Sequence, residues 1–119
     1  GAKKVIFVEN YNKVIPILKK NLNDLKTKKN YKVLEFDINN DFKSITIGEK
    51  FDIIFIDPPF KENNLEVLLI HIQKKNILKK SGIIIIHRHK KANEILPNSF
   101  KIIEEKTYGL SKITFLNFC

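Results

Sequence analysis

The fold of this chain is decided by residues 51–60, which read Phe-Asp-Ile-Ile-Phe-Ile-Asp-Pro-Pro-Phe. The apolar run 53–56 predicts a strand buried on both faces, the usual state of a strand in a parallel sheet. Two prolines then end the strand, because proline has no N–H to donate. In open α/β sheets ligands bind at the carboxyl ends of the strands. The stretch therefore predicts a functional turn that offers the carboxylate of Asp57, proline carbonyls and the ring of Phe60 to an amino group on a planar base.

Strand and helix patterns alternate along the rest of the chain. Alternation of this kind predicts a mostly parallel sheet with crossover helices, and the length allows one domain, residues 1–119. Two further β-rich runs surround a Tyr-Gly turn near the C-terminus and predict an antiparallel pair. Strands are expected at 4–8, 32–36, 52–56, 83–86, 100–106 and 113–118, and helices over 14–25 and from about 65 to 72.

Three local features refine this prediction. The second helix is expected to bury a leucine-rich inner face and to begin at a cap formed by Asn63 or Asn64. Residues 79–82, Lys-Lys-Ser-Gly, predict a turn before the isoleucine strand. Asn10 or Asn12 can cap the first helix, in which Pro16 disturbs only the first turn. The expected inner face of the second helix consists of Leu65, Leu68, Leu69 and Ile72.

Composition points to a basic globular protein. The formal net charge is +9, with 22 basic and 13 acidic residues, which favours a polyanionic partner such as nucleic acid. The alternative is the lysine-rich usage of an AT-rich genome. No apolar run approaches the ~20 residues that cross a bilayer, so we expect no membrane partner. The one cysteine, Cys119, excludes an intramolecular disulfide and agrees with a cytoplasmic location.

Acidic residues follow three of the predicted strands. Glu9, Asp37 and Asp57 each end a hydrophobic run, so all three are expected along one edge of the sheet. In nucleoside-binding α/β sheets, such an acid accepts hydrogen bonds from ribose hydroxyls, and another can accept from an adenine amino group. The alternative is that these acids are ordinary helix caps and turn formers. Their common position makes the functional interpretation the stronger one.

The turn 57–60 resembles the [D/N/S]-P-P-[F/Y/W] motif of S-adenosylmethionine-dependent methyltransferases that act on amino groups of bases. Taken with residues 3–9 and 108–114, in this order and spacing, it is similar to the bacterial 16S ribosomal RNA guanine-N2-methyltransferase family. The resemblance spans nearly the whole chain. It implies a Rossmann-like class I methyltransferase sheet, S-adenosylmethionine as cofactor, and 16S ribosomal RNA or the small ribosomal subunit as partner.

The resemblance also implies roles for individual residues. Glu9 matches the acid that holds the ribose of the methyl donor, and Asp37 lies near its adenine. Asp57 and the Pro58 carbonyl accept hydrogen bonds from the guanine N2 amino group, and Phe60 stacks on the extruded base. The implied catalytic residues are Asp57, Pro58, Pro59 and Phe60, and the implied cofactor-binding residues are Glu9, Asn10, Asp37 and Ile38.

A basic segment, residues 87–91, follows the isoleucine strand and is expected at the same edge as the proline turn. It can grip RNA phosphates near the target base, although a solvated charged loop is an equal alternative. We expect no metal site, because His87 and His89 have no evident third ligand. The candidate RNA-binding residues are Lys61, Arg88, His89, Lys90 and Lys91.

The chain departs from the family pattern at its start. Such enzymes begin with a strand that ends in a glycine-rich turn, and this sequence has four scattered glycines and no such turn. We therefore expect the first βα unit to be missing and the domain to be partial. Two alternatives stay open: an adenine-N6 methyltransferase of DNA or RNA, which uses a similar turn, and a non-catalytic basic RNA-binding remnant.

Overall fold

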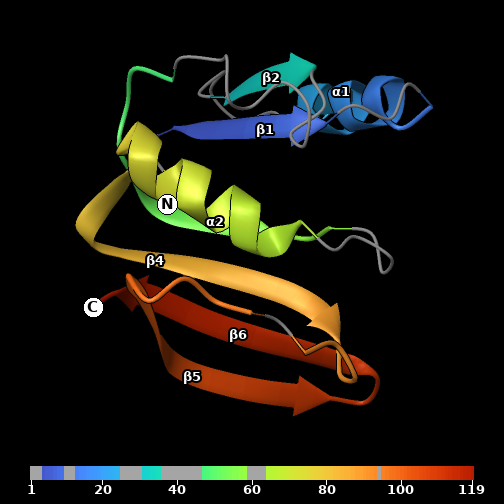
Figure 1. Cartoon of the computed structure of the whole chain (residues 1–119). Helices are drawn as coiled ribbons and strands as arrows, with labels where there is room; N and C mark the ends of the chain where they lie inside the picture. The colour runs from blue at the N-terminus through green and yellow to red at the C-terminus, as the bar shows by residue number, and fades with distance from the viewer. Residues whose placement is uncertain (1–3, 10–12, 25–30, 36–46, 59–63, 94) are drawn as a thin grey trace. The chain divides into compact units, whose positions relative to one another are not determined.

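The structure, a computed structural model, describes residues 4–9, 13–24, 31–35, 47–58, 64–93 and 95–119. The chain divides into two compact units, residues 1–45 and 46–119, and its strands form two sheets (Figure 1). The single domain and the missing βα unit expected from the sequence stay predictions. Within the described ranges, no helix is long and apolar enough to cross a membrane.

The first unit is a strand–helix–strand motif. It contains β1 (Val5–Glu9), α1 (Ile15–Asp24) and β2 (Tyr31–Glu35). The two strands are parallel and pair residue for residue along their whole length, so that Glu9 ends opposite Glu35. Parallel neighbours need a crossover connection, which explains why a helix separates them in the sequence.

Helix α1 buries the side chains of Ile15 and Leu22. Pro16 is its second residue, where the missing N–H costs no helical hydrogen bond. At the start of the helix, Leu18 N–H donates a hydrogen bond of 2.9 Å to the Val14 carbonyl. The proposed caps Asn10 and Asn12 lie outside the described residues.

The second unit contains a four-stranded sheet and one helix. Its strands lie in the order β3-β4-β6-β5, with β3 and β4 parallel and the other neighbours antiparallel. Helix α2 links β3 to β4 and runs along the sheet beside them (Figure 1). The alternation and the C-terminal antiparallel pair predicted from the sequence are confirmed. The bounds are β3 Phe51–Ile56, α2 Leu65–Lys75, β4 Leu78–His89, β5 Phe100–Tyr108 and β6 Ser111–Phe118.

The core of this unit lies between α2 and the sheet. All four leucines and isoleucines predicted for the inner face of α2 are buried. Leu69, Ile84 and Leu116 have no exposed surface, and burying a side chain of this size contributes about 2 kcal/mol. Asn64 occupies the N-cap position, but its side chain makes no capping hydrogen bond. Asn76 ends the helix in the left-handed conformation, with φ of 56°, which asparagine tolerates well.

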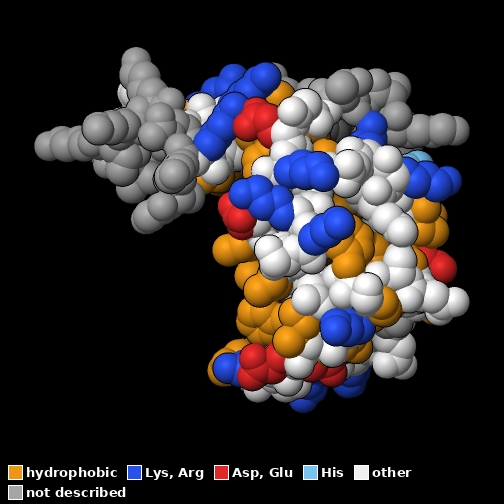
Figure 2. Space-filling model, turned by 90° about the vertical axis from the view of Figure 1, so that its left-hand side faces the viewer, with side chains coloured by type: hydrophobic (Ala, Val, Ile, Leu, Met, Phe, Trp, Pro, Cys, Tyr) orange, Lys and Arg blue, Asp and Glu red, His pale blue; other side chains and the backbone are white. Residues whose placement is uncertain are grey.

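The prediction that β3 is buried on both faces is wrong. Ile56 is 8% exposed, whereas Ile53 and Phe55 are each 61% exposed. Alternate side chains of a strand point to opposite faces, and α2 packs on only one of them. The strand also lies at the edge of its sheet. Figure 2 shows hydrophobic side chains gathered on the surface of this unit.

The predicted turn at residues 79–82 is also wrong, because these residues belong to β4. The pairing register of β4 shifts opposite residues 51–53 of β3, so the strand carries extra residues in an irregular stretch. Lysine and serine side chains there are exposed, but Gly82 is packed closely. A Cβ added at Gly82 would lie 2.5 Å from Cδ1 of Leu78. The polar signal therefore marks a bulged strand rather than a chain reversal.

The C-terminal hairpin brings the start of β6 to the end of β4. Gly109 adopts a φ of +56° in the turn, which favours glycine. At the open end of the hairpin the rings of Phe100 and Phe118 stack, with centroids 5.1 Å apart. Because β4 and β6 are antiparallel, Ser111 pairs with His89, the last residue of β4.

Candidate active site at the carboxyl end of β3

Asp57 comes directly after β3, at the edge of the sheet where parallel strands present ligands. Ile56 pairs with Ile86, so Asp57 and His87 occupy equivalent positions on neighbouring strands. The Asp57 side chain is 58% exposed and points to solvent rather than into the core. Pro58, half-buried, follows it. The carboxylate of Asp57 is thus accessible at this edge, and its catalytic role stays a prediction.

Two hydrogen bonds join three side chains at this edge. Nδ1 of His87 lies 2.9 Å from Oδ1 of Asp57, and Nε2 of His87 lies 3.0 Å from Oγ of Ser111. The three residues come from the end of β3, from β4 and from the start of β6. Ser111 pairs with His89, two residues along from His87, so its side chain reaches the imidazole diagonally on one face of the sheet.

The chemistry of the partners fixes the direction of both hydrogen bonds. An ionised carboxylate only accepts, so Nδ1 of His87 carries the proton that is donated to Asp57. In the neutral imidazole Nε2 is then an acceptor, and the Ser111 hydroxyl donates to it. One carboxylate oxygen, Oδ1, is thereby engaged. The other oxygen stays available to a ligand that donates hydrogen bonds.

The His87–Asp57 pair contributes little to folding stability. The His87 and Asp57 side chains are 36% and 58% exposed, and even a fully charged pair with this exposure is worth about 0–1 kcal/mol. A pair of this kind is a poor stabiliser of the sheet. Its position at a ligand-binding edge is therefore its more informative property.

Several sequence-predicted site residues lie outside the described residues. On the catalytic side these are Pro59 and Phe60, with the neighbouring Lys61. On the cofactor side, Glu9 is placed by its backbone at the end of β1. The remaining predicted cofactor residues, Asn10, Asp37 and Ile38, fall outside the described ranges. Their proposed roles stay predictions.

The basic segment after the isoleucine run is not a loop throughout, because β4 continues to His89. Arg88 is 8% exposed and lies on the same face of β4 as the buried Ile84 and Ile86. Lys90 and Lys91 are exposed in the turn that follows. The turn is fixed by a hydrogen bond of 2.8 Å from Lys90 N–H to the Leu110 carbonyl. Two exposed lysines therefore stand one turn away from the Asp57–His87–Ser111 cluster.

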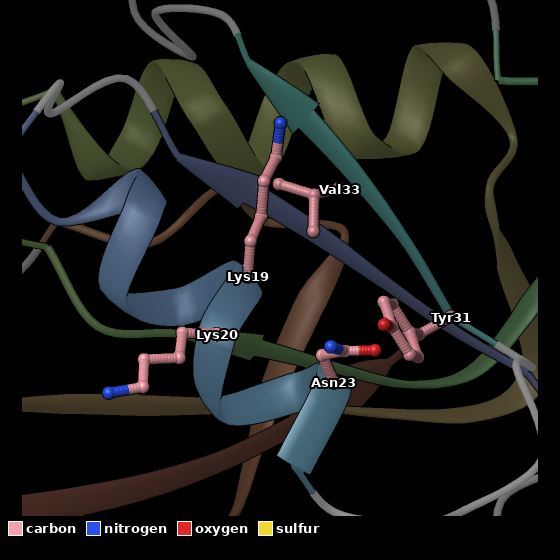
Figure 3. A pocket seen from close by; sticks show the side chains of 5 residues that line it. All are labelled: Lys19, Lys20, Asn23, Tyr31 and Val33. Carbon is pink, nitrogen blue, oxygen red and sulfur yellow. The ribbon is translucent and has the colours of Figure 1, made fainter.

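A separate hollow of about 620 Å³ lies in the first unit between α1 and β2. It contains none of the predicted site residues. Figure 3 shows the Asn23 side chain directed toward Tyr31, whereas Lys20 points away. The lining residues are Lys19, Lys20, Asn23, Tyr31 and Val33.

Sequence reasoning missed the contact between His87 and Asp57. Both residues follow apolar strands, and the helix between those strands predicts a parallel pair, so their proximity could have been inferred. The hydrogen bond to Ser111 gave no such signal, because it depends on β6 being the other neighbour of β4.

The fold is that of the class I methyltransferases. A structure of a methyltransferase from Podospora anserina with bound S-adenosylhomocysteine superposes with a TM-score of 0.70 over 98% of this chain and 61% of that one, at 13% identity. A solved structure from Haemophilus influenzae gives a TM-score of 0.80 over 97% of this chain and 72% of that one, at 31% identity.

The chain belongs to the family described as conserved hypothetical protein 95, whose pattern matches residues 1–117. A curated relative, ribosomal RNA small subunit methyltransferase D of Haemophilus influenzae, is 34% identical over 110 residues. The match covers 92% of this chain and 57% of that relative. The chain thus spans little more than half the length of this relative.

Proposed function

We propose that this protein takes part in S-adenosylmethionine-dependent methylation of the exocyclic N2 amine of a guanine in 16S ribosomal RNA, in the cytoplasm. The observation that carries the proposal is the exposed carboxylate of Asp57, held by His87 at the carboxyl end of β3 and followed by Pro58. The name of the curated relative supports a small-subunit RNA substrate. The choice of guanine N2 rests on the motif resemblance.

An aromatic amine is a poor nucleophile because its lone pair is delocalised into the ring. Acceptors that bind its two hydrogens orient the lone pair for attack on a methyl group. They also stabilise the positive charge that develops on nitrogen. The free oxygen of Asp57 and the carbonyl of Pro58 are acceptors of the required kind. A site that binds the amine through two acceptors also selects an –NH₂ group over a carbonyl oxygen.

The carboxyl end of β1 carries an acceptor residue that suits a nucleoside cofactor. Glu9 and Glu35 end the parallel strands β1 and β2 in register. Carboxylates accept hydrogen bonds and ribose hydroxyls donate them, so Glu9 is assigned to the ribose of S-adenosylmethionine, with Asn10 beside it. Asp37 and Ile38 are assigned to its adenine. When bound, S-adenosylmethionine supplies an electrophilic methyl group on a sulfonium centre.

RNA contact is assigned to the exposed lysines beyond β4. Lys90 and Lys91 can pair with phosphates next to the target base, with Lys61 and His89 assisting. Arg88 is the member of the predicted set that burial makes unsuitable for this role. Phosphate contacts of this kind position a nucleic acid without reading its sequence.

The identity of the methylated nucleoside tests the proposal. The full-length protein is incubated with small ribosomal subunits or 16S RNA and methyl-labelled S-adenosylmethionine, and the RNA is digested to nucleosides. Label in N2-methylguanosine is the expected result. Label in N6-methyladenosine would contradict the guanine assignment and favour the adenine alternative. RNA retention without any methyl transfer, by a protein that also fails to bind the cofactor, would favour the non-catalytic remnant.

A further inference from the structure

We infer that His87 is a positioning residue for Asp57, and that Ser111 in turn holds the imidazole in the tautomer this role requires. The inference rests on the proposed function in one respect, because its consequence for rate is measured as methyl transfer. The structural part of the inference, which nitrogen of His87 carries the proton, does not depend on the proposed function.

The hydrogen bond from His87 fixes the orientation of the Asp57 carboxylate. A carboxylate on a solvent-exposed residue can rotate, and each rotamer presents its oxygens differently. The bond of 2.9 Å from Nδ1 to Oδ1 removes that freedom and leaves the second oxygen for the substrate amine. Orientation of a reacting partner lowers the barrier by reducing the entropy lost in reaching the transition state.

Ser111 completes the arrangement. A histidine ring can flip or exchange its proton between the two nitrogens, and either change would remove the donor that faces Asp57. The Ser111 hydroxyl, 3.0 Å from Nε2, donates to that nitrogen and therefore favours the proton on Nδ1. The partner of one ring nitrogen commonly sets the state of the other in this way.

The groups next to the cluster, His89 and the backbone of β6, support this arrangement of the three side chains. His89, on the same face of β4, is engaged elsewhere, because its Nδ1 accepts a hydrogen bond of 3.1 Å from Lys91 N–H. It does not compete for Asp57 in this conformation. Ser111 is held by β6 at a fixed register against β4. The three side chains thus come from β4, from β6 and from the residue directly after β3, all in one sheet.

The first test uses two amides that mimic different nitrogens of histidine. His87→Asn places an N–H near the position of Nδ1 and keeps the bond to Asp57. His87→Gln reaches instead toward Ser111. With the full-length protein, we expect His87→Asn to retain kcat within about threefold and His87→Gln to lose about tenfold, the effect of one hydrogen bond to a charged group. KM for the cofactor should change less than twofold in both variants.

The matched control is His71→Asn on α2, which removes a histidine outside the cluster and should leave kcat unchanged. Ser111→Ala should lower kcat about threefold through the loosened imidazole. Equal losses for His87→Asn and His87→Gln, or a rise in KM with kcat unchanged, would overturn the positioning role.

The second test needs no catalysis. Nitrogen NMR of the full-length protein distinguishes the two neutral tautomers, and the proton of neutral His87 should reside on Nδ1. Ser111→Ala should shift the population toward Nε2–H. A wild-type protein with the proton on Nε2 would overturn the inference. If the tautomer is as expected but no RNA is methylated, the proposed function fails while the geometric inference stands.

Discussion

Each end of the β3–β4 ladder carries a pair of an acid and a basic side chain, and the two pairs have different surroundings. At the amino end, Asp52 of β3 lies 3.0 Å from Nζ of Lys79 of β4. At the carboxyl end, Asp57 lies 2.9 Å from Nδ1 of His87. Asp52 is the more exposed acid, at 78% against 58%. Among the described residues, the second pair is extended by a hydrogen bond between His87 and Ser111, and a proline directly follows its acid.

The comparison teaches that an acid–base pair across two strands does not by itself define a site. Coulomb attraction between exposed groups is weak at either end. The carboxyl end differs because two parallel strands and an antiparallel neighbour place three side chains together on one edge. Three variant pairs turn this difference into four measurements, each comparing the same change at the two ends or at matched positions.

The largest difference is expected in methyl transfer. Asp57→Ala removes an acceptor for the amine and should lower kcat at least about 100-fold, equivalent to about 2.7 kcal/mol of transition-state stabilisation. Asp52→Ala removes a carboxylate from the same strand and should change kcat less than about twofold. Steady-state methyl transfer to 16S RNA measures kcat for both variants. Similar losses in the two variants would remove the distinction between the ends.

The irregular stretch of β4 lies at the amino end of the ladder, opposite residues 51–53 of β3, and it should be sensitive to added volume. Gly82→Ala would place a methyl group 2.5 Å from Leu78 Cδ1 and 2.9 Å from the Lys79 carbonyl oxygen. Overpacking of this kind destabilises by about 1–3 kcal/mol, which urea unfolding measures. Gly48→Ala, where no atom lies within 4 Å of the added Cβ, is the control. A neutral Gly82→Ala would show that this stretch relaxes freely.

The lysines at the two ends should differ in RNA binding. Lys90→Ala/Lys91→Ala removes two exposed charges beyond the carboxyl end and should weaken RNA affinity about tenfold. The slope of log affinity against log salt should fall by the equivalent of about one to two phosphate contacts. Lys79→Ala/Lys80→Ala removes the same charge from the amino end and should weaken affinity less than about threefold. Filter binding over a range of salt measures both. Identical salt slopes would indicate that net charge alone binds RNA.

The smallest effect is expected in folding stability. Both pairs are exposed, so Asp52→Ala and Asp57→Ala should each change the free energy of unfolding by less than about 1 kcal/mol. Chemical denaturation checks this with the same two variants used for activity. A loss of several kcal/mol in Asp57→Ala would assign the His87 contact to the stability of the sheet.

The sequence predicted the elements of the fold well, because their signals are local. Leucines spaced three and four apart predicted the buried face of α2, and the isoleucine run predicted β4. It overestimated the burial of Ile53 and Phe55, since apolar character does not reveal whether a strand has one covered face or two. It also took lysines 79 and 80 for a turn, because polar residues in a bulge and in a turn have the same composition.

At the candidate site, the sequence identified the acid but not its partners. Asp57 was recognisable from an apolar run and the prolines that follow it. His87 lies 30 positions away from Asp57, and Ser111 lies 24 positions beyond His87. The strand–helix–strand pattern could have placed His87 beside Asp57, but the contact with Ser111 follows only from the strand order β3-β4-β6.

By itself, the amino-acid sequence determined where strands and helices form, which acid ends β3, and the basic character of the chain, since these depend on residue type and near neighbours. The tertiary structure decided which side chains meet. It buried Arg88, exposed Phe55 and joined Asp57, His87 and Ser111, because neighbours in a sheet are chosen by backbone pairing between segments far apart in the chain.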